Sequence, residues 1–544
     1  MKKEENLGQE NKSINFWLCV VLLTVLLVST LSRDITRPFY GLHSWAQASG
    51  AWVARSHIRY GLGYTKGLST WAVGQPPAET PTRYFDHPNL PGLTKAGIML
   101  VFGCDEFGAR MARMILSVIT LLLLLKILKG LVDEKTALLA GLIYIMFPLT
   151  GYFGAGDWPL TFSLLALWNY LVLIGGLTDA PAPARIHKWG LAIGLFLALQ
   201  FGWAGFFYAF TIGLHYVARC VFKKQRPDKV LLAILIIAPL SSLAINMAIM
   251  AGGYGWDLQK IVELYKWRSA KGEMRQFVWS KWFATLWEFA LTNFTASVLT
   301  TAFLYLTIGQ FIVFASPGSK EKGAEISRKF PQMWLFLMPG VFLLLTFKGL
   351  VWRHQYWQRP LAPFIAIATA LAIMLVWDVL KKVNRRLAAA CAVSLVSIFM
   401  ILCIKGTNFY YSMRWQPPEK IKMFKTLNQR IPADKALLSY EHFIVNQHKS
   451  KGGFYRPEIA WYLDRDIVPA RSLDEIKGLA ATGRYPCYLV PYAKDLLPFI
   501  NQLTKLYKYE YITGTPGEKT KDGKFFRAGM MPYMIFDLSS QVPN

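Results

Sequence analysis

Long uncharged apolar blocks recur along the chain and alternate with polar, often basic, segments. Each block approaches the roughly 20 apolar residues that a helix needs to cross a bilayer. The blocks are apolar throughout, unlike the one-sided stripe of a helix on a soluble protein. The pattern therefore predicts transmembrane helices at 16–32, 109–127, 136–156, 158–178, 231–251, 290–315, 330–347, 358–379 and 387–404.

The apolar stretch 190–218 allows two interpretations. As one helix it is longer than a bilayer requires. As a hairpin of two short helices it turns at 202–205, where the sequence reads Gly-Trp-Ala-Gly. Basic loops of membrane proteins lie on the cytoplasmic side, and the basic clusters of this chain share one side only if the hairpin forms. These clusters are at 188, 219–226, 320–329 and 381–386.

With the hairpin, the chain is predicted to be an α-helical polytopic membrane protein with about eleven transmembrane helices. The membrane domain covers 1–404, with a cytoplasmic N-terminus and large outer loops at 33–108 and 252–288. From Lys405 the composition changes, and short apolar runs alternate with helical stretches. We therefore predict a soluble α/β domain at 405–544 on the outer side, with strands at 436–439, 485–491 and 534–538.

Composition and charge support this picture. Hydrophobic residues make up 53% of the 544 residues and charged residues 17%, which excludes a disordered chain. The net charge of +27 is compatible with nucleic-acid binding, but its position in loops between apolar blocks favours a membrane protein. The six cysteines are widely spaced, so neither a disulfide framework nor a zinc site is indicated.

Polar and ionisable residues gather in three segments that share the outer face under this topology. Carboxylates there can act as general bases toward a hydroxyl or amine, and basic groups can bind a phosphate leaving group. Because nucleotide sugars are cytoplasmic, a sugar donor on this side would arrive on a lipid phosphate. The candidates are Asp34, His43, Lys66, Arg83, Asp86 and His87 in the first loop, Asp157, and then Lys348, Arg353, His354 and Tyr356.

Several short segments resemble the GT-C superfamily of integral-membrane glycosyltransferases, nearest glycosyltransferase family 39, which includes protein O-mannosyltransferases and the aminoarabinose transferase of lipid A. They are His43-x-Trp45 with Ala54-Arg55, Tyr84-Phe85-Asp86-His87-Pro88, Tyr152 to Asp157, and Arg353-His354-Gln355-Tyr356-Trp357 followed by Arg359-Pro360-Leu361-Ala362-Pro363. The resemblance implies inverting transfer of a sugar from a polyprenyl-phosphate donor to a lipid, glycan or protein. It also implies a multi-pass location in a bacterial inner membrane, with the C-terminal domain periplasmic or extracellular.

One departure from the family concerns the catalytic base. The resemblance places a catalytic Asp-Glu pair where this chain has Ala46-Gln47, and neither of these residues can act as a base. We therefore expect Asp86 to take the role, with Asp34 second and His43 also possible. Asp157 is a further site candidate. Phosphate or substrate binding is expected of Lys66, Arg83, His87, Lys348, Arg353, His354 and Tyr356.

Other interpretations remain open. Asp86 and Asp157 can each cap a helix that begins at a nearby proline. The Asp464-Arg465-Asp466 motif can hold a metal in some glycosyltransferases, but a solvated turn is the simpler interpretation, and the sequence indicates neither a metal nor another cofactor. A transporter or flippase, and a non-catalytic member that binds lipid-linked glycans, are the alternative functions. The expected partners are the lipid donor, membrane lipids and the acceptor, with no nucleic acid.

Overall fold

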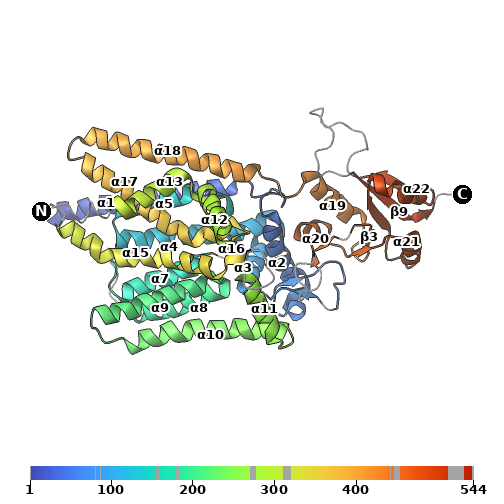
Figure 1. The fold of residues 1–544 in the computed structure, drawn as a ribbon, viewed down its shortest axis with the longest axis horizontal. Helices are drawn as coiled ribbons and strands as arrows, with labels where there is room; N and C mark the ends of the chain where they lie inside the picture. Colours follow the sequence, from blue (N-terminus) through green and yellow to red (C-terminus); the bar gives the residue numbers. More distant parts are fainter. Residues whose placement is uncertain are drawn as a thin grey trace. The chain divides into compact units, whose positions relative to one another are not determined.

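The computed structural model describes residues 2–79, 81–85, 87–154, 156, 159–177, 184–269, 277–309, 320–441, 443–445, 454–512 and 532–541. Helices dominate, and the chain divides into two compact units (Figure 1). The first unit contains 1–35, 85–91 and 110–411. The second contains 36–84, 92–109 and 412–544. The second unit therefore joins most of the predicted first outer loop to the C-terminal part of the chain.

The first unit is built from helices, long and short. Those that begin its chain are α1 (Lys2–Ser32), α4 (Glu106–Leu131), α5 (Glu134–Met146), α6 (Pro148–Phe153) and α7 (Thr161–Leu173). They are followed by α8 (Arg185–Phe201), α9 (Ala204–Phe222), α10 (Lys229–Gly253), α11 (Leu258–Arg268), α12 (Trp279–Phe294) and α13 (Ala296–Leu304) with the π-helix η1 (Tyr305–Gly309). The last are α15 (Lys320–Thr346), α16 (Lys348–Val351), the 3-10 helix η3 (Gln355–Leu361), α17 (Ala362–Leu380) and α18 (Arg385–Ser412).

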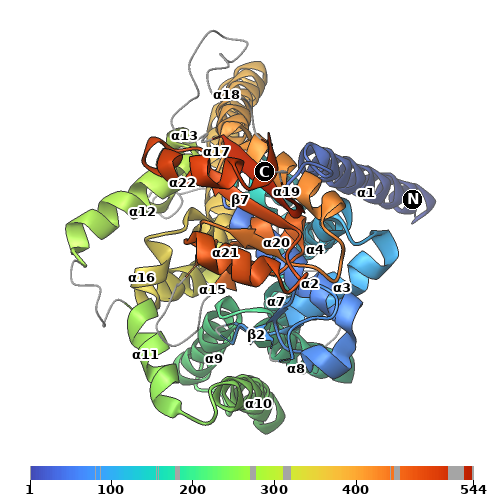
Figure 2. The ribbon, with the colours of Figure 1, turned by 90° about the vertical axis from the view of Figure 1, so that its right-hand side faces the viewer.

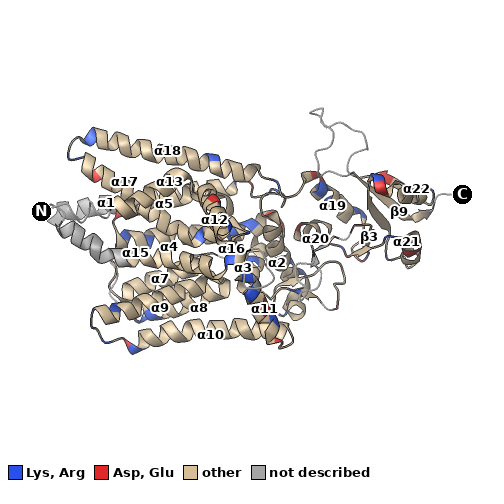
Figure 3. Ribbon diagram, in the orientation of Figure 1, with Lys and Arg blue, Asp and Glu red and all other residues tan. Residues whose placement is uncertain are grey.

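The chain is a multi-pass membrane protein. Within the described residues, six helices are long and apolar enough to cross a membrane, and α12 with α13 and η1 form a further candidate bent by 101°. The charged residues of this unit gather toward the helix ends, while the middle of most helices carries few of them (Figure 3). Shorter apolar helices such as α7 fall below the length of a full span. The total of eleven spans stays a prediction.

The stretch 190–218 forms two helices. The first, α8, ends at Phe201, and α9 begins at Ala204, with Gly202 in an extended conformation between them. Figures 1 and 2 show α8 beside α9 and α10. The predicted turn is therefore present, and the alternative of one overlong helix is wrong. Asp228 then starts α10, because its carboxylate accepts hydrogen bonds from the N–H groups of Val230 and Leu231.

The second unit has a sheet with helices on both faces. Its main sheet has the strand order β6-β3-β7-β9-β8, in which β3 is parallel to β6 and β7, and β9 is antiparallel to β7 and β8. The helices are α2 (Ser44–Thr65), α3 (Leu90–Phe102), α19 (Pro418–Arg430), α20 (Pro457–Leu463), α21 (Leu473–Ala480), η4 (Lys494–Leu496) and α22 (Leu497–Thr504). The main strands are β3 (Leu437–Ser439), β6 (Ile467–Pro469), β7 (Cys487–Pro491), β8 (Tyr507–Tyr511) and β9 (Tyr533–Gln541). Two small pairs are β1 (Thr70–Trp71) with β2 (Thr82–Arg83), and β4 (Ile444–Val445) with β5 (Phe454–Tyr455).

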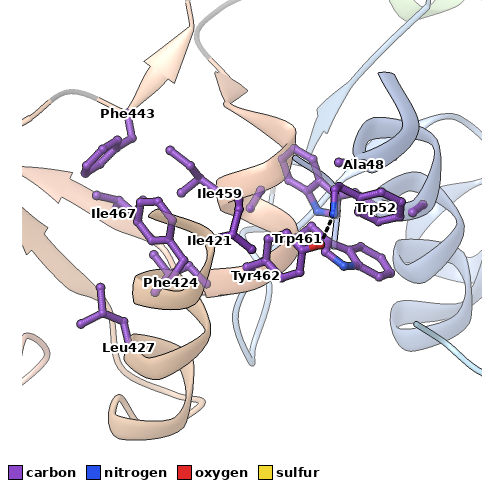
Figure 4. Packing of buried hydrophobic residues seen from close by; sticks show 14 of the residues in the cluster. Ala48, Trp52, Ile421, Phe424, Leu427, Phe443, Ile459, Trp461, Tyr462 and Ile467 are labelled. Atoms are coloured by element: carbon purple, nitrogen blue, oxygen red, sulfur yellow. Dashed lines mark hydrogen bonds between the residues drawn. The ribbon is translucent and has the colours of Figure 1, made fainter. Parts of the chain in front are cut away.

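Alternation along the strands divides the core of this unit in two. Leu437, Leu489 and Ile535 pack into a cluster with residues of α2, α19 and α20. The next residues in each strand, including Leu438, belong to a second cluster with residues of α21 and α22. The first of these clusters also contains Trp52 of α2 (Figure 4). The first-loop segment therefore supplies part of the hydrophobic core beneath this sheet.

The Asp464-Arg465-Asp466 motif lies in this unit and is not a solvated turn. Asp464 is buried and ends α20 with a positive φ of 51°. Its carboxylate pairs with Arg59 and, at 3.2 Å, with Arg55, both on α2. Arg465 is also buried and donates to backbone carbonyls, including that of Ile431 at 2.8 Å. The expectation of a solvated turn is wrong for Asp464, because the buried Arg55 and the more exposed Arg59 both hold its carboxylate inside the unit.

This pairing makes a stability prediction. Asp464→Asn leaves Arg55 buried without its carboxylate, and we expect a loss of about 3–5 kcal/mol in the free energy of unfolding. Asp466→Asn is the matched control, because Asp466 pairs at 3.5 Å with the exposed Arg484, and it should change stability by only about 0.5 kcal/mol. Thermal unfolding of the purified protein measures both, and equal effects would contradict the assignment.

Candidate active site

Three of the predicted polar segments converge within the first unit. The segment 85–91 contacts η3, because the ring of His87 stacks on that of Trp357 with centroids 6.5 Å apart. The segment after α5 contacts η3 as well, because the ring of Phe153 lies 5.7 Å from that of Tyr356. The three segments are separated by long stretches of sequence, and each of them carries part of the family resemblance.

Gly156 lies directly against the side chain of Arg359 in this region. Gly156 has a positive φ of 61°, which favours glycine. A Cβ atom at this position would lie 2.6 Å from both terminal nitrogens of Arg359. Arg359 is buried, at 7% exposed. The backbone before residue 157 therefore lies directly against a buried guanidinium, and a side chain at 156 would displace it.

His87 is a neutral imidazole in this environment. Burial, and secondarily the charge of Arg268, hold the pKa of His87 well below its usual value. Nε2 of His87 lies 3.4 Å from a terminal nitrogen of Arg268, the last residue of α11. A neutral imidazole accepts a hydrogen bond from a guanidinium at this position. If His87 contacts a phosphate, it does so as a neutral group rather than as a cation.

The lowered pKa of His87 makes stability depend on pH. In the unfolded chain His87 takes up a proton near its ordinary pKa of about 6.5, whereas the folded protein does so only at lower pH. Stability therefore falls as pH drops below about 6.5, by at most about 1.4 kcal/mol per pH unit. We expect His87→Gln to flatten the fall in melting temperature between pH 7.5 and pH 5. Equal slopes for wild type and variant would contradict the assignment.

A buried amide network holds η3 in place. Asn293 of α12 donates from Nδ2 to the carbonyl of Gln355 and to Oε1 of Gln358, each at 2.9 Å. Gln358 donates in turn to the carbonyl of Leu286 at 2.7 Å. The hydroxyl of Tyr410 on α18 donates to Oδ1 of Asn293 at 2.8 Å. Fully satisfied buried networks of this kind rigidify what they join, so the network fixes the helix that carries Tyr356 and Arg359.

A second polar cluster in the same unit contains Asp34. Arg110 of α4 donates to the carbonyl of Ile35 at 3.1 Å, and Arg113 donates to that of Tyr152 at 3.0 Å. Asp34 is half-buried and acts electrostatically on Tyr152. Tyr152 is the chain neighbour of Phe153, which contacts η3. Asp34 therefore lies in a basic environment that is continuous with the convergent segments.

The predicted residues after α15 differ in their surroundings. The ammonium of Lys348 lies 4.1 Å from the ring centroid of Trp279, in a cation–π contact. Arg353 is exposed. The ring of His354 stacks on that of Tyr356 at 5.3 Å, with an interplanar angle of 10°. Of these, Tyr356 belongs to η3 itself and contacts Phe153 of the neighbouring convergent segment.

The remaining predicted residues belong to the second unit or lie outside the described residues. His43 is buried, has a positive φ of 52°, and stacks on Trp415 at 5.4 Å. Lys66 is exposed at the end of α2, and Arg83 donates to the carbonyl of Tyr64 at 3.1 Å. His43, Lys66 and Arg83 therefore belong to the second unit and are not part of the convergent segments of the first unit. Asp86 and Asp157 are outside the described residues, next to His87 and Gly156 respectively.

Sequence reasoning did not select four arginines of this region as site residues, although Arg359 stands among the polar residues of the outer turn that leads into 358–379. Arg110 and Arg113 stand in the first turns of a span that is otherwise apolar, and that position is a usable signal because charges near a membrane are costly. Arg359 stood inside a segment of the family resemblance. Arg268 gave no local signal, since its segment is polar throughout. Within the described part of the chain, no group of three or more His, Cys, Asp or Glu side chains gathers as metal ligands.

Comparisons with known proteins agree with this fold. Residues 86–244 match the family model of dolichyl-phosphate-mannose-protein mannosyltransferases. Two solved structures of ArnT from Cupriavidus metallidurans are similar over almost the whole chain. The one bound to undecaprenyl phosphate has a TM-score of 0.57 at 10% identity, covering 95% of this chain and 97% of that one. The apo structure has a TM-score of 0.55 at 12% identity, covering 97% and 98%.

A search of curated protein sequences found no match. At such low identity the two ArnT structures establish a shared fold, while the family model adds a sequence match. That match begins at Asp86, and it extends across the Tyr152–Asp157 segment. The predicted resemblance of this chain to the GT-C superfamily of integral-membrane glycosyltransferases, near family 39, is thereby confirmed.

Proposed function

We propose that the protein transfers a sugar from a polyprenyl-phosphate donor to a lipid, glycan or protein acceptor at the outer face of a bacterial inner membrane. The observation that carries the proposal is the convergence of His87, Gly156 and η3 within the first unit. Three family-like segments meet there around buried arginines. The ArnT structure with undecaprenyl phosphate supports the donor class, because a protein of this fold binds a polyprenyl phosphate.

The arginines suit the leaving group of this reaction. Cleaving the sugar from its lipid carrier leaves negative charge on a phosphate, and charge-assisted donors in a site of low dielectric stabilise that charge. Arg359 and Arg268 are both buried, at 7% and 4% exposed. A planar guanidinium can donate two parallel hydrogen bonds to a phosphate, which a lysine cannot. We assign them the phosphate, alongside the candidates His87, His354 and Tyr356.

A carboxylate supplies the other half of the reaction. The base takes a proton from the acceptor hydroxyl or amine as the acceptor attacks the anomeric carbon, and the carbon–oxygen bond to the lipid phosphate breaks. A single displacement of this kind inverts the anomeric configuration. We assign the base to Asp86, beside His87 in the chain, and keep Asp34 as the second choice because it lies near Tyr152. Asp157, which follows Gly156 in the chain, stays a further candidate for the site.

Two of the remaining predicted residues have secondary roles in this proposal. Lys348 and Arg353 would attract the anionic donor to the outer face. Lys66, Arg83 and His43 stay predictions from the sequence and have no part in the site proposed for the first unit. The proposed topology places the N-terminus in the cytoplasm and the C-terminal segment outside, as the basic loops indicate.

Reconstitution tests the function directly. The purified protein is placed in proteoliposomes with a membrane extract as acceptor source, and radiolabelled sugar is supplied on each of a panel of polyprenyl phosphates. We expect label to move from at least one donor, and Arg359→Ala to abolish the transfer. If the folded protein moves label from none of them, the proposal is wrong, and a binding or transport function is favoured.

A further inference from the structure

The parallel strands of the second unit meet at a topological switch point. The chain runs from β3 to β6 on one side of β3, and then to β7 on the other side. In open α/β sheets, ligands bind outside the carboxyl ends of the strands at such a point. Glu441 follows β3 at this end, and Tyr533 pairs with Pro491, the last residue of β7. Glu441 and Tyr533 therefore lie at the end of the sheet where the topology favours a bound ligand.

A connected set of ionisable side chains occupies this edge. The hydroxyl of Tyr533 donates to Oε2 of Glu441 at 2.8 Å and accepts from Nζ of Lys420 at 3.4 Å. The Lys420 ammonium also lies 5.4 Å from the ring centroid of Phe443 and 5.6 Å from that of Tyr533. Arg456 acts electrostatically on Lys420 and on Tyr533. The groups come from α19, β9 and the segments that follow β3 and precede α20.

A buried carboxylate also lies in the same unit, at the start of α20. Glu458 is 1% exposed and accepts a hydrogen bond from the hydroxyl of Ser44 at 2.8 Å. Burial raises its pKa. Burial also lowers the pKa of Lys420, against the opposing charge of Glu441. Two shifted groups near one charged residue, Arg456, are a pattern that occurs more often at functional sites than in ordinary cores.

We propose that this edge of the second unit is a saccharide-binding site that contacts the acceptor. Carboxylate, ammonium and guanidinium groups form paired hydrogen bonds to neighbouring sugar hydroxyls. The partly exposed Lys420 and Glu441 and the exposed Arg456 supply such groups, and the buried rings of Tyr533 and Phe443 pack against Lys420 from the core side. The choice of a saccharide rests on the proposed transfer, whereas the site itself rests on the switch point and the side-chain cluster.

Binding is measured on the intact protein without donor, so that it does not depend on transfer. The probe is the oligosaccharide fraction released by mild acid from the envelope of the native cells, titrated against the protein in lipid nanodiscs. We expect Glu441→Gln and Lys420→Met to weaken binding about tenfold or more, since each removes a hydrogen bond to a charged group. Lys422→Met is the matched control, because Lys422 is exposed on the same helix.

A measurement on the wild type covers the case in which a variant fails to fold. Lysine acetylation is followed by mass spectrometry with and without the oligosaccharides, and we expect protection of Lys420 but not of Lys422. No binding, or binding that protects both lysines equally, would overturn the proposal. The cluster would then have only a structural role, in which it joins α19 to β9. Specific binding without any transfer would retain the site while the proposed reaction failed.

Discussion

Asp86→Asn is expected to lower sugar transfer by about 10²- to 10⁴-fold, because this range is what a positioned general base contributes to a proton transfer. The substitution preserves the shape of the side chain and removes only its ability to accept a proton. Donor binding should be retained, since the phosphate is assigned to the arginines. The measurement is the initial rate of transfer in proteoliposomes, with donor binding determined separately on the same preparation.

Two further carboxylates make the result decisive. Asp34→Asn tests the second candidate, which lies in the cluster around Tyr152. Asp378→Asn is the control, because Asp378 pairs with Lys381 three residues later on the same exposed helix end and should leave transfer unchanged. Full activity of Asp86→Asn would end that assignment. Loss of activity in Asp34→Asn alone would move the base to Asp34.

Gly156→Ala is expected to reduce transfer about 100-fold while the protein still folds. The new methyl group would lie 2.6 Å from both terminal nitrogens of Arg359, so the guanidinium must move. A displacement of about 1 Å at a catalytic group can cost about 10²-fold in rate. The measurement is the rate of transfer together with the affinity for the polyprenyl-phosphate donor, which should also weaken.

Gly175→Ala separates the steric effect from the backbone strain. Gly175 has a φ of 62°, nearly that of Gly156, but nothing lies within 4 Å of its added Cβ atom. Both variants therefore share a strain of about 1–2 kcal/mol, and only one of them displaces Arg359. Similar transfer rates in the two variants would show that the contact between Gly156 and Arg359 does not matter for the reaction.

The sequence by itself determined the membrane character of the chain and favoured a break within 190–218. The length of an apolar block is enough to favour a helix that crosses the bilayer. The basic residues of a loop likewise indicate its side of the membrane without any tertiary contact. The predicted topology also places the segments around His87, Gly156 and Tyr356 on the same side of the membrane, and these segments are in contact in the structure. Short family-like motifs also identified the segments that contact η3 in the structure.

Only the tertiary structure decided which groups in those segments are buried, paired or neutral. The local sequence around Asp464 predicted a solvated turn. Instead, Arg55 and Arg59, which are far away along the chain, pair with Asp464 and keep it buried. The lowered pKa of His87 depends on burial and on Arg268, which the local pattern does not contain. Hydrophobic periodicity records which face of an element is buried, whereas the partner on that face comes from a distant segment. That is why the sequence located the segments of the candidate site and the folded chain decided their chemistry.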